Sequence, residues 1–500
     1  MQTAPEFTVN PDHVIALGEK FLNIKLAGEG PPQVPWNEPT LKSFRKAIEL
    51  GRGGLPMAYR KGFVEPLEKH LERVLALTGS GAASDGGDPD PEPAETVLGA
   101  VYCHAPEFDV DEQTHRFGVV IADLFRSFLS REKRLNLNLP LLETLPPLPT
   151  FKHRSFGPFT YPVDRIKDGI DAAVAIVSMP STYRNDPLLW TSLAHETGGH
   201  DVTHANPGML TEIESNVRAW FQAAAYRFRS TGDTEHAELA MQLGEVWAHW
   251  VDEATADVCG VLNIGPTFPF TFAPWLAALR ARIKQSEFPA LMSLSTSGPK
   301  SPLDPHPVDL LRPYLMSGVI QSLYALDPQR RASYVNSISE LMSSFADGKD
   351  TVGIAGGIKD AQGQPRTIEV EIPLELAGHL AAQVGQLIAN MPLRSLGGNS
   401  LQQLETWSET DEALALQIAD GLHDGKAGDH DSTHLLAGGS IAVLRDPECY
   451  QSITDTLNCG LSQLAQRDPL WSDFHPHYSV SMGEAVCQSS TGDSSPAKGQ

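Results

Sequence analysis

The chain has 500 residues, of which 41% are hydrophobic, so it is long enough to bury a large core in two or three domains or in one elaborated fold. Lysine and arginine number 38 against 62 aspartates and glutamates, which gives a formal net charge of −24 at pH 7. A surface this acidic repels phosphate backbones and anionic lipid headgroups, so neither nucleic acid nor membrane is expected as a partner.

The N-terminal residues lack the features of a targeting segment. Residues 1–10 contain neither the basic flank nor the apolar run of a signal peptide, and the chain has no stretch of about 18 apolar residues that would cross a membrane. The five cysteines are scattered without a CxxC pair, which disfavours a cysteine zinc cluster and fits reduced thiols. These features predict a cytoplasmic protein.

Helical patterns dominate the N-terminal region, residues 1–145. Apolar residues recur at helical spacing in three segments, 41–51, 66–77 and 112–131. The stretch 79–93 (GSGAASDGGDPDPEP) is poor in apolar residues, which predicts a disordered loop. A proline-rich connector at 139–149 blocks helix continuation, so a boundary is placed near residue 145.

The second region, residues 146–267, has a mixed pattern. The apolar run 172–179 predicts a buried strand, although its alanines leave a helix possible. If this strand is the sheet edge that lines the cleft, an extended peptide could pair with it by main-chain hydrogen bonds. Asp186 and Pro187 are a good N-cap and first-turn pair for a helix that continues to about residue 205. Two further helices are predicted, 209–228 and 234–262.

The third region, residues 268–488, is predicted to be mainly helical, with one hairpin at 352–372 around a turn at 360–363. The polar tail 489–500 is predicted to be disordered. Strand content is low throughout the chain. The predicted fold class is therefore mainly α (α+β), with a small β-sheet between helical N- and C-terminal regions.

The segment 193–204 (LAHETGGHDVTH) places three histidines and two carboxylates on one predicted helix. A zinc hydrolase needs imidazole ligands, an open position for water and a carboxylate beside that water. His195 and His200 are five residues apart, so on a regular helix their imidazoles lie roughly 140° out of line. Gly198 and Gly199 lie between them, and each costs about 1 kcal/mol in a helix. We therefore predict a π-bulge that realigns the two imidazoles.

The same segment contains a second pattern. His200, Asp201 and His204 form HDxxH with regular four-residue spacing, which would make His200 and His204 the ligands and Asp201 the base without any bulge. In that arrangement the diglycine has no explanation. His204 is therefore kept as an alternative ligand.

The third ligand is expected from the later helical segment 250–257 (WVDEATAD). Glu253 would bind the metal, and His249 is a weaker rival. Asp257 lies one helical turn further on the same face, where it could accept the free ring N–H of a ligand histidine. The predicted cofactor is one Zn²⁺ per chain on His195, His200 and Glu253.

These motifs resemble those of known zinc peptidases. HETGGH (195–200) is similar to the HExxGH signature of dipeptidyl peptidase III, and DEATAD (252–257) is similar to the later acidic helix of that family. Glu253 to Asp257 also resembles the ExxAD helix of gluzincins, including the HtpX-like and CAAX prenyl endopeptidases. Their HPxxxxR element is similar to residues 306–312 (HPVDLLR). The resemblance is confined to motif positions between 195 and 312, and it implies a zincin-like (gluzincin) metallopeptidase core.

The predicted function is hydrolysis of peptide bonds in a peptide or protein substrate. Zinc would make the bound water acidic, and Glu196 would take its proton as general base. A second donor should stabilise the oxyanion. The candidates for that donor are His306, Arg312 and Tyr314, with His434 or Tyr478 as outsiders.

Two other functions remain open at this point. One is a non-catalytic zincin-like scaffold or binding protein, against which an intact Glu196 argues. The other is an HD-type metal-dependent phosphohydrolase, because His195, His200 and Asp201 with a later aspartate loosely match the pattern H, HD, D. That function would leave Glu196 and Glu253 idle.

Overall fold

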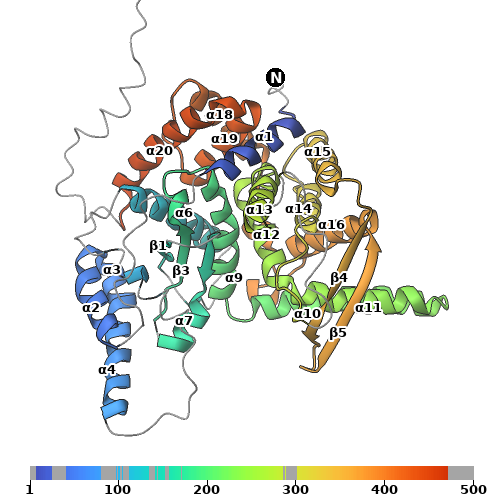
Figure 1. The fold of residues 1–500 in the computed structure, drawn as a ribbon, viewed down its shortest axis with the longest axis horizontal. Helices are drawn as coiled ribbons and strands as arrows, with labels where there is room; N and C mark the ends of the chain where they lie inside the picture. Colours follow the sequence, from blue (N-terminus) through green and yellow to red (C-terminus); the bar gives the residue numbers. More distant parts are fainter. Residues whose placement is uncertain are drawn as a thin grey trace, which may run out of the picture.

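The computed structural model describes residues 7–24, 41–79, 97, 99–101, 104, 112–134, 141–142, 145–152, 157–170, 172–284, 288 and 301–470. These residues form mainly helices, with two small β-sheets (Figure 1), which confirms the mainly helical fold class. The predicted tail 489–500 and Tyr478 lie outside the described residues, as does the predicted loop 79–93 beyond Gly79.

The helices predicted in the N-terminal region are present. An additional helix, α1, precedes them, and its N-cap Asn10 accepts a hydrogen bond from the Asp12 amide at 3.0 Å. The elements here are α1 (Pro11–Asn23), α2 (Leu41–Gly51), α3 (Met57–Tyr59), the π-helical turn η2 (Arg60–Val64), α4 (Glu65–Gly79) and α6 (Glu112–Arg134). Helix α1 packs against α13 (Phe268–Lys284), and α6 packs against α20 (Tyr450–Arg467).

A three-stranded sheet follows in the chain. Its strands are β1 (Leu148–Lys152), β2 (Phe159–Tyr161) and β3 (Ile176–Pro180), in the order β1-β3-β2, with β1 parallel and β2 antiparallel to β3. The strand predicted within 172–179 is present as β3, and it is the central strand of the sheet rather than an edge. Every residue of β3 is buried, because an apolar run without alternation fits a strand covered on both faces.

The motif segment is helical from Leu189 to Ala205, but it changes its winding three times. It consists of a 3₁₀ turn (Leu189–Ser192), α8 (Leu193–His195), the π-helical stretch η5 (Glu196–Asp201) and α9 (Val202–Ala205). The π-helical winding predicted from the spacing of the two histidines is therefore confirmed. Strand β2 and helix α12 (Val251–Ile264) both contact η5.

The diglycine allows η5 to lie directly on α12. A Cβ atom added at Gly199 would be 2.5 Å from the Cα atom of Ala256, and one added at Gly198 would be 2.7 Å from Nδ2 of Asn263. Both distances are far below the usual separation of non-bonded atoms, which is about 3.5–4.0 Å between carbons. Glycine is therefore needed at position 199 for this close packing, because the obstructing Cα atom belongs to the α12 backbone, whereas at position 198 the side-chain amide of Asn263 would have to shift.

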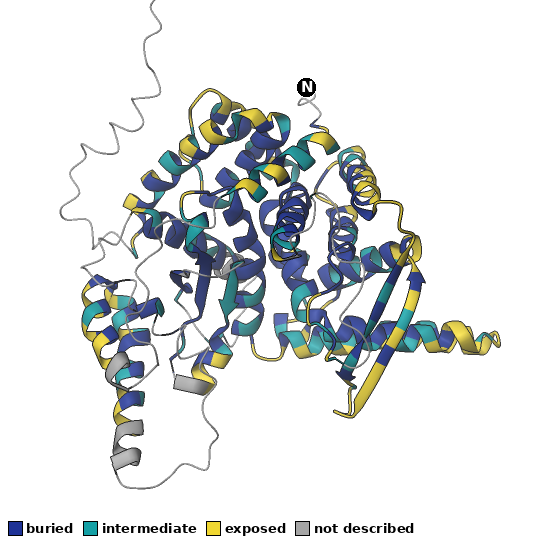
Figure 2. Cartoon of the chain, viewed as in Figure 1, coloured by how far each residue is buried: buried dark blue, intermediate teal, exposed yellow. Residues whose placement is uncertain are grey.

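The predicted helix 234–262 is divided into two helices at Trp250. The backbone there has φ −88° and ψ 4°, outside the α-helical region, and the indole donates a hydrogen bond to the carbonyl of Asp304 at 2.9 Å. The break separates α11 (Thr234–His249) from α12, and α10 (Met209–Ser230) precedes α11. Figures 1 and 2 show α10 and α11 projecting from the body with an exposed tip, whereas every residue of α12 except Asp252 and Glu253 is buried.

The C-terminal region is mainly helical, as predicted, and contains the predicted hairpin. Its turn places Gly363 at φ 74°, which glycine adopts without strain. The elements are α14 (Leu311–Gln321), α15 (Pro328–Ala346), β4 (Thr351–Lys359), β5 (Pro365–Pro373), α16 (Leu374–Asn390), α17 (Leu401–Leu404), α18 (Glu409–His423) and α19 (Ser432–Arg445).

One large apolar cluster joins residues from all three predicted regions, from Phe7 to Leu461. The division at residues 145 and 267 stays a prediction.

No helix among the described residues is both long and apolar enough to span a membrane. Within the same residues Cys259 and Cys449 are free.

Candidate metal centre

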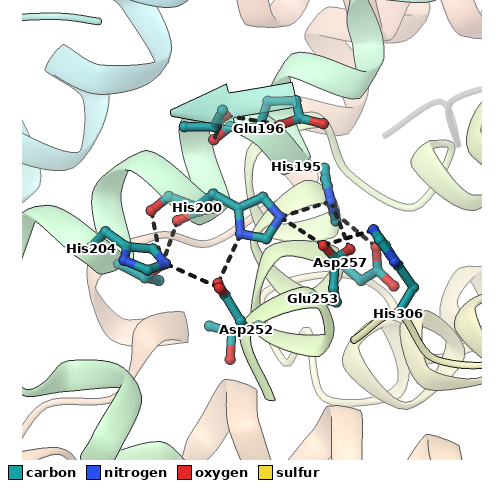
Figure 3. A network of polar contacts seen from close by, with 12 residues as sticks. His195, Glu196, His200, His204, Asp252, Glu253, Asp257 and His306 are labelled. Carbon is teal, nitrogen blue, oxygen red and sulfur yellow. Dashed lines mark hydrogen bonds and ion pairs between the residues drawn. The ribbon is translucent and has the colours of Figure 1, made fainter. Parts of the chain in front are cut away.

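Three predicted ligands converge where η5 packs on α12 (Figure 3). The Nε2 atoms of His195 and His200 are 3.2 Å apart, and each lies 3.3 Å from one carboxylate oxygen of Glu253. The donor atoms of all three side chains lie within 4.8 Å of one another. Two imidazole nitrogens and a carboxylate form a group that could hold a metal ion.

Asp257 and Arg312 support His195 from α12 and α14. The Nδ1 atom of His195 is 3.0 Å from Oδ1 of Asp257, which is the contact predicted for that aspartate. The Arg312 guanidinium donates two hydrogen bonds to Asp257, at 2.7 and 2.8 Å, and its Nη2 lies 3.3 Å from Oε2 of Glu253. Arg312 is buried, and its guanidinium faces the carboxylates of Asp257 and Glu253 on α12.

The ring of His200 is held at its other nitrogen by Asp252. Its Nδ1 lies 2.8 Å from Oδ1 of Asp252, whose Oδ2 lies 3.1 Å from Nε2 of His204. The remaining nitrogen of His204 is 2.9 Å from Oδ2 of Asp164 on α7 (Val163–Ile170). A second group, His200, His204 and Asp252, thus also brings its donor atoms within 4.8 Å.

Glu196 lies on the β2 side of the cluster (Figure 3). Its side chain is buried, and its Oε2 lies 2.9 Å from the hydroxyl of Thr160 on β2. The same hydroxyl is 3.0 Å from the Glu196 carbonyl. The single proton of the Thr160 hydroxyl is therefore shared between the carbonyl and the carboxylate of the predicted base. Sequence reasoning missed Thr160, because a single threonine on a short strand carries no motif.

His306 contacts the cluster from the loop before α14. Its Nε2 lies 3.3 Å from Oε1 of Glu253, and its Nδ1 lies 2.7 Å from Oδ1 of Asp304. The His306 side chain is 48% exposed, so this imidazole is open to solvent on one side. Asp304 was not predicted, although its position two residues before the histidine is a usable signal for such a pair.

Other predicted candidates have contacts elsewhere. The ring of Tyr314 lies against Gly378 of α16, and a Cβ atom there would be 3.1 Å from it. His434 stacks on Trp407 and pairs with Asp431, the N-cap of α19, and with Asp411 of α18. His249 points its Nε2 at the carbonyl of Leu303, at 3.1 Å. Asp201, the base of the HDxxH pattern, is fully buried.

Opposite charges dominate the electrostatics of the cluster. Burial by itself lowers the pKa of His200, but the charge of Glu253 and a hydrogen bond with Asp252 raise it well above its usual value. Burial likewise opposes ionisation of Glu253, yet the charge of His200 and the hydrogen bond with His195 hold the Glu253 pKa well below its usual value. The carboxylates therefore draw positive charge to the point where the donor atoms meet.

Comparison of the whole chain with models of protein families, with curated proteins and with solved structures finds no match. The positions and chemistry of the side chains are therefore what a functional proposal can draw on. Of the predicted site residues, those that contact one another here are His195, His200, Glu253, Asp257, His306 and Arg312.

Proposed function

We propose that this chain is a zinc-dependent metallopeptidase with a zincin-like core, in which His195, His200 and Glu253 bind the metal. The observation that carries the proposal is the convergence of these three donor atoms within 4.8 Å, produced by a π-helical turn that realigns the two histidines. Such turns cost stability and occur frequently at functional sites.

The donor set fits zinc in a catalytic arrangement. Catalytic zinc sites use three protein ligands and leave a further position open, and two histidines with one glutamate are a common combination. The Nδ1 atoms of both histidines face carboxylates, those of Asp257 and Asp252, which favours the tautomer with a free Nε2 lone pair. Bound there, zinc would polarise a carbonyl oxygen and lower the pKa of a water molecule.

Glu196 is the residue we assign to proton transfer. Its carboxylate follows the first ligand directly in sequence, and Thr160 holds one of its oxygens at 2.9 Å. The other oxygen is left to accept a proton from the attacking water and to deliver it to the leaving amine. The role of general base requires a carboxylate held in one orientation, and the hydrogen bond to β2 supplies that restraint.

His306 is the best candidate for oxyanion stabilisation among the residues named from the sequence. It is half-exposed, touches Glu253 and is oriented by Asp304, so its Nε2 can turn toward a substrate oxygen. Arg312 is better suited to positioning, because two hydrogen bonds tie it to buried Asp257.

Strand β2 supports a peptide as the substrate. It is an edge strand of the three-stranded sheet, and its central residue, Thr160, contacts Glu196. An extended peptide can add to such an edge by main-chain hydrogen bonds, which would place a scissile bond beside the proposed base. This replaces the predicted role of the 172–179 strand, which is central.

The phosphohydrolase alternative has weaker support. Its His200–Asp201 pair would need Asp201 at the metal, whereas Asp201 is fully buried and His200 directs its nitrogens to Asp252 on one side and to His195 and Glu253 on the other. A net charge of −24 also disfavours a phosphorylated substrate.

Metal analysis of the purified protein, followed by incubation with a mixed peptide library with and without a chelator, tests the proposal. We expect one zinc per chain and cleavage that the chelator abolishes and added zinc restores. Zinc binding without cleavage of any peptide would support the scaffold alternative. Phosphate release with two metals would support the phosphohydrolase.

A further inference from the structure

Four side chains form a line that leads away from the candidate metal centre, and Figure 3 labels the first three of them, His200, Asp252 and His204. His200 contacts Asp252 at 2.8 Å, Asp252 contacts His204 at 3.1 Å, and His204 contacts Asp164 at 2.9 Å. The two imidazoles are each 12% exposed, whereas the side chains of Asp252 and Asp164 are 41% and 42% exposed. The line therefore connects three helical segments and ends in solvent.

We propose that His204 and Asp164 are positioning residues that hold Asp252 against His200, so that the Nε2 atom of His200 stays directed at His195 and Glu253. This inference rests on the proposed function, because it assigns the two residues to the same metal centre. It gives His204 a role other than that of a ligand.

The need for such a support follows from the place of Asp252. It lies in the first turn of α12, and its side chain is 41% exposed, so water competes for its carboxylate. A carboxylate held only at Oδ1 could rotate and release the imidazole. His204 binds Oδ2, so that both oxygens of Asp252 are fixed by histidines from the motif segment.

His204 is directed at two carboxylates, Nε2 toward Asp252 and Nδ1 toward Asp164, and not at the point where the donor atoms of His195, His200 and Glu253 meet. The HDxxH spacing of His200 and His204 brings both rings to the same aspartate.

Co²⁺ binding by the full chain tests this inference. The dissociation constant is measured by competition with a chelator for the wild type, His204→Gln and Asp164→Ala, together with the visible absorption of the bound Co²⁺. Matched controls are His236→Gln, which removes an exposed histidine that pairs with Asp233 on α11, and Asp168→Ala, which removes an exposed aspartate of α7.

We expect both test variants to bind one Co²⁺ per chain about 10-fold more weakly than the wild type, with an altered visible spectrum, because each loosens Asp252, the direct partner of the metal-binding His200. Both controls should match the wild type. The double variant His204→Gln/Asp164→Ala should lose little more affinity than His204→Gln alone, because the two residues act through one chain.

A merely structural role would lower the melting temperature of the metal-free variants while the Co²⁺ affinity and spectrum stay unchanged, and that result would overturn the inference. Complete loss of the metal in His204→Gln would make His204 a ligand and overturn it as well. Failure of the proposed function is seen separately in the wild type. Metal binding without peptide cleavage refutes the peptidase alone, and no metal binding by the wild type refutes both.

Discussion

Replacing Gly199 by alanine should disrupt the contact between the π turn and α12. The added Cβ atom would be 2.5 Å from the Cα and 2.7 Å from the Cβ of Ala256, about 1 Å short of a normal carbon contact. The obstructing Cα atom belongs to the backbone of α12, so no side-chain rotation relieves the overlap. The segment that carries His200 and the helix that carries Glu253 must then move apart.

The magnitude of the change can be estimated for Gly199→Ala. Overpacking a core costs typically about 1–3 kcal/mol, and the gain in helix propensity returns at most about 1 kcal/mol. The net loss of unfolding free energy is therefore up to about 2 kcal/mol if the full propensity gain is realised, and up to about 3 kcal/mol if none of it is. Metal–ligand distances tolerate only about 0.2 Å, so a separation near 1 Å should weaken zinc binding by more than about 10-fold.

The assay combines chemical denaturation of the metal-free protein with zinc titration against a competing chelator. Gly99→Ala is the matched control, because Gly99 is also helical but an added Cβ atom there would meet nothing within 4 Å. The control should be as stable as the wild type or slightly more stable, with unchanged zinc affinity. If Gly199→Ala behaves like this control in both measurements, the reasoning on the diglycine is wrong.

Three further changes have distinct expected outcomes. Glu196→Gln should lower kcat for peptide cleavage by about 10²–10⁴-fold while zinc content stays at one per chain, and loss of zinc would contradict its role as base. The control is Glu340→Gln, which changes an exposed glutamate of α15. His306→Gln should lower kcat by about 10²–10³-fold at unchanged zinc affinity, whereas an unchanged kcat would exclude it as oxyanion donor. Burial raises the pKa of Asp186 from 3.8 to about 6 despite a hydrogen bond from the Tyr450 hydroxyl at 2.6 Å. The stabilisation of the wild type by protonated Asp186 is therefore complete below pH 3.8 and is lost as the pH rises through 6. Asparagine cannot ionise, so the unfolding free energy of Asp186→Asn should rise by about 3 kcal/mol relative to that of the wild type between pH 3.5 and 7. Denaturation curves of both proteins across that range check this, and a difference independent of pH would refute it.

The π turn could be predicted because its signals are local. The five-residue spacing of His195 and His200 and the diglycine between them lie within one helix, so helix geometry alone indicates the missing alignment. The pairing of Asp257 with His195 followed from a similar local rule, since Asp257 is one turn beyond Glu253. Periodicity likewise located most of the helices and the β4–β5 hairpin.

The features that sequence reasoning missed depend on tertiary packing. The order of the strands is set by how β1 and β2 add to β3, so the apolar run of β3 could not reveal that it is central. The break at Trp250 accompanies a hydrogen bond to the distant Asp304. Asp164 carries no motif, and its contact with His204 arises because α7 packs beside α9.

A crystal structure of the zinc-loaded protein with anomalous data collected at the zinc edge tests the central claim most directly. We predict a single anomalous peak about 2.0–2.2 Å from Nε2 of His195, Nε2 of His200 and the carboxylate of Glu253. A peak between His204 and Asp252 instead, or no peak near these helices in crystals grown with zinc, would contradict the assignment.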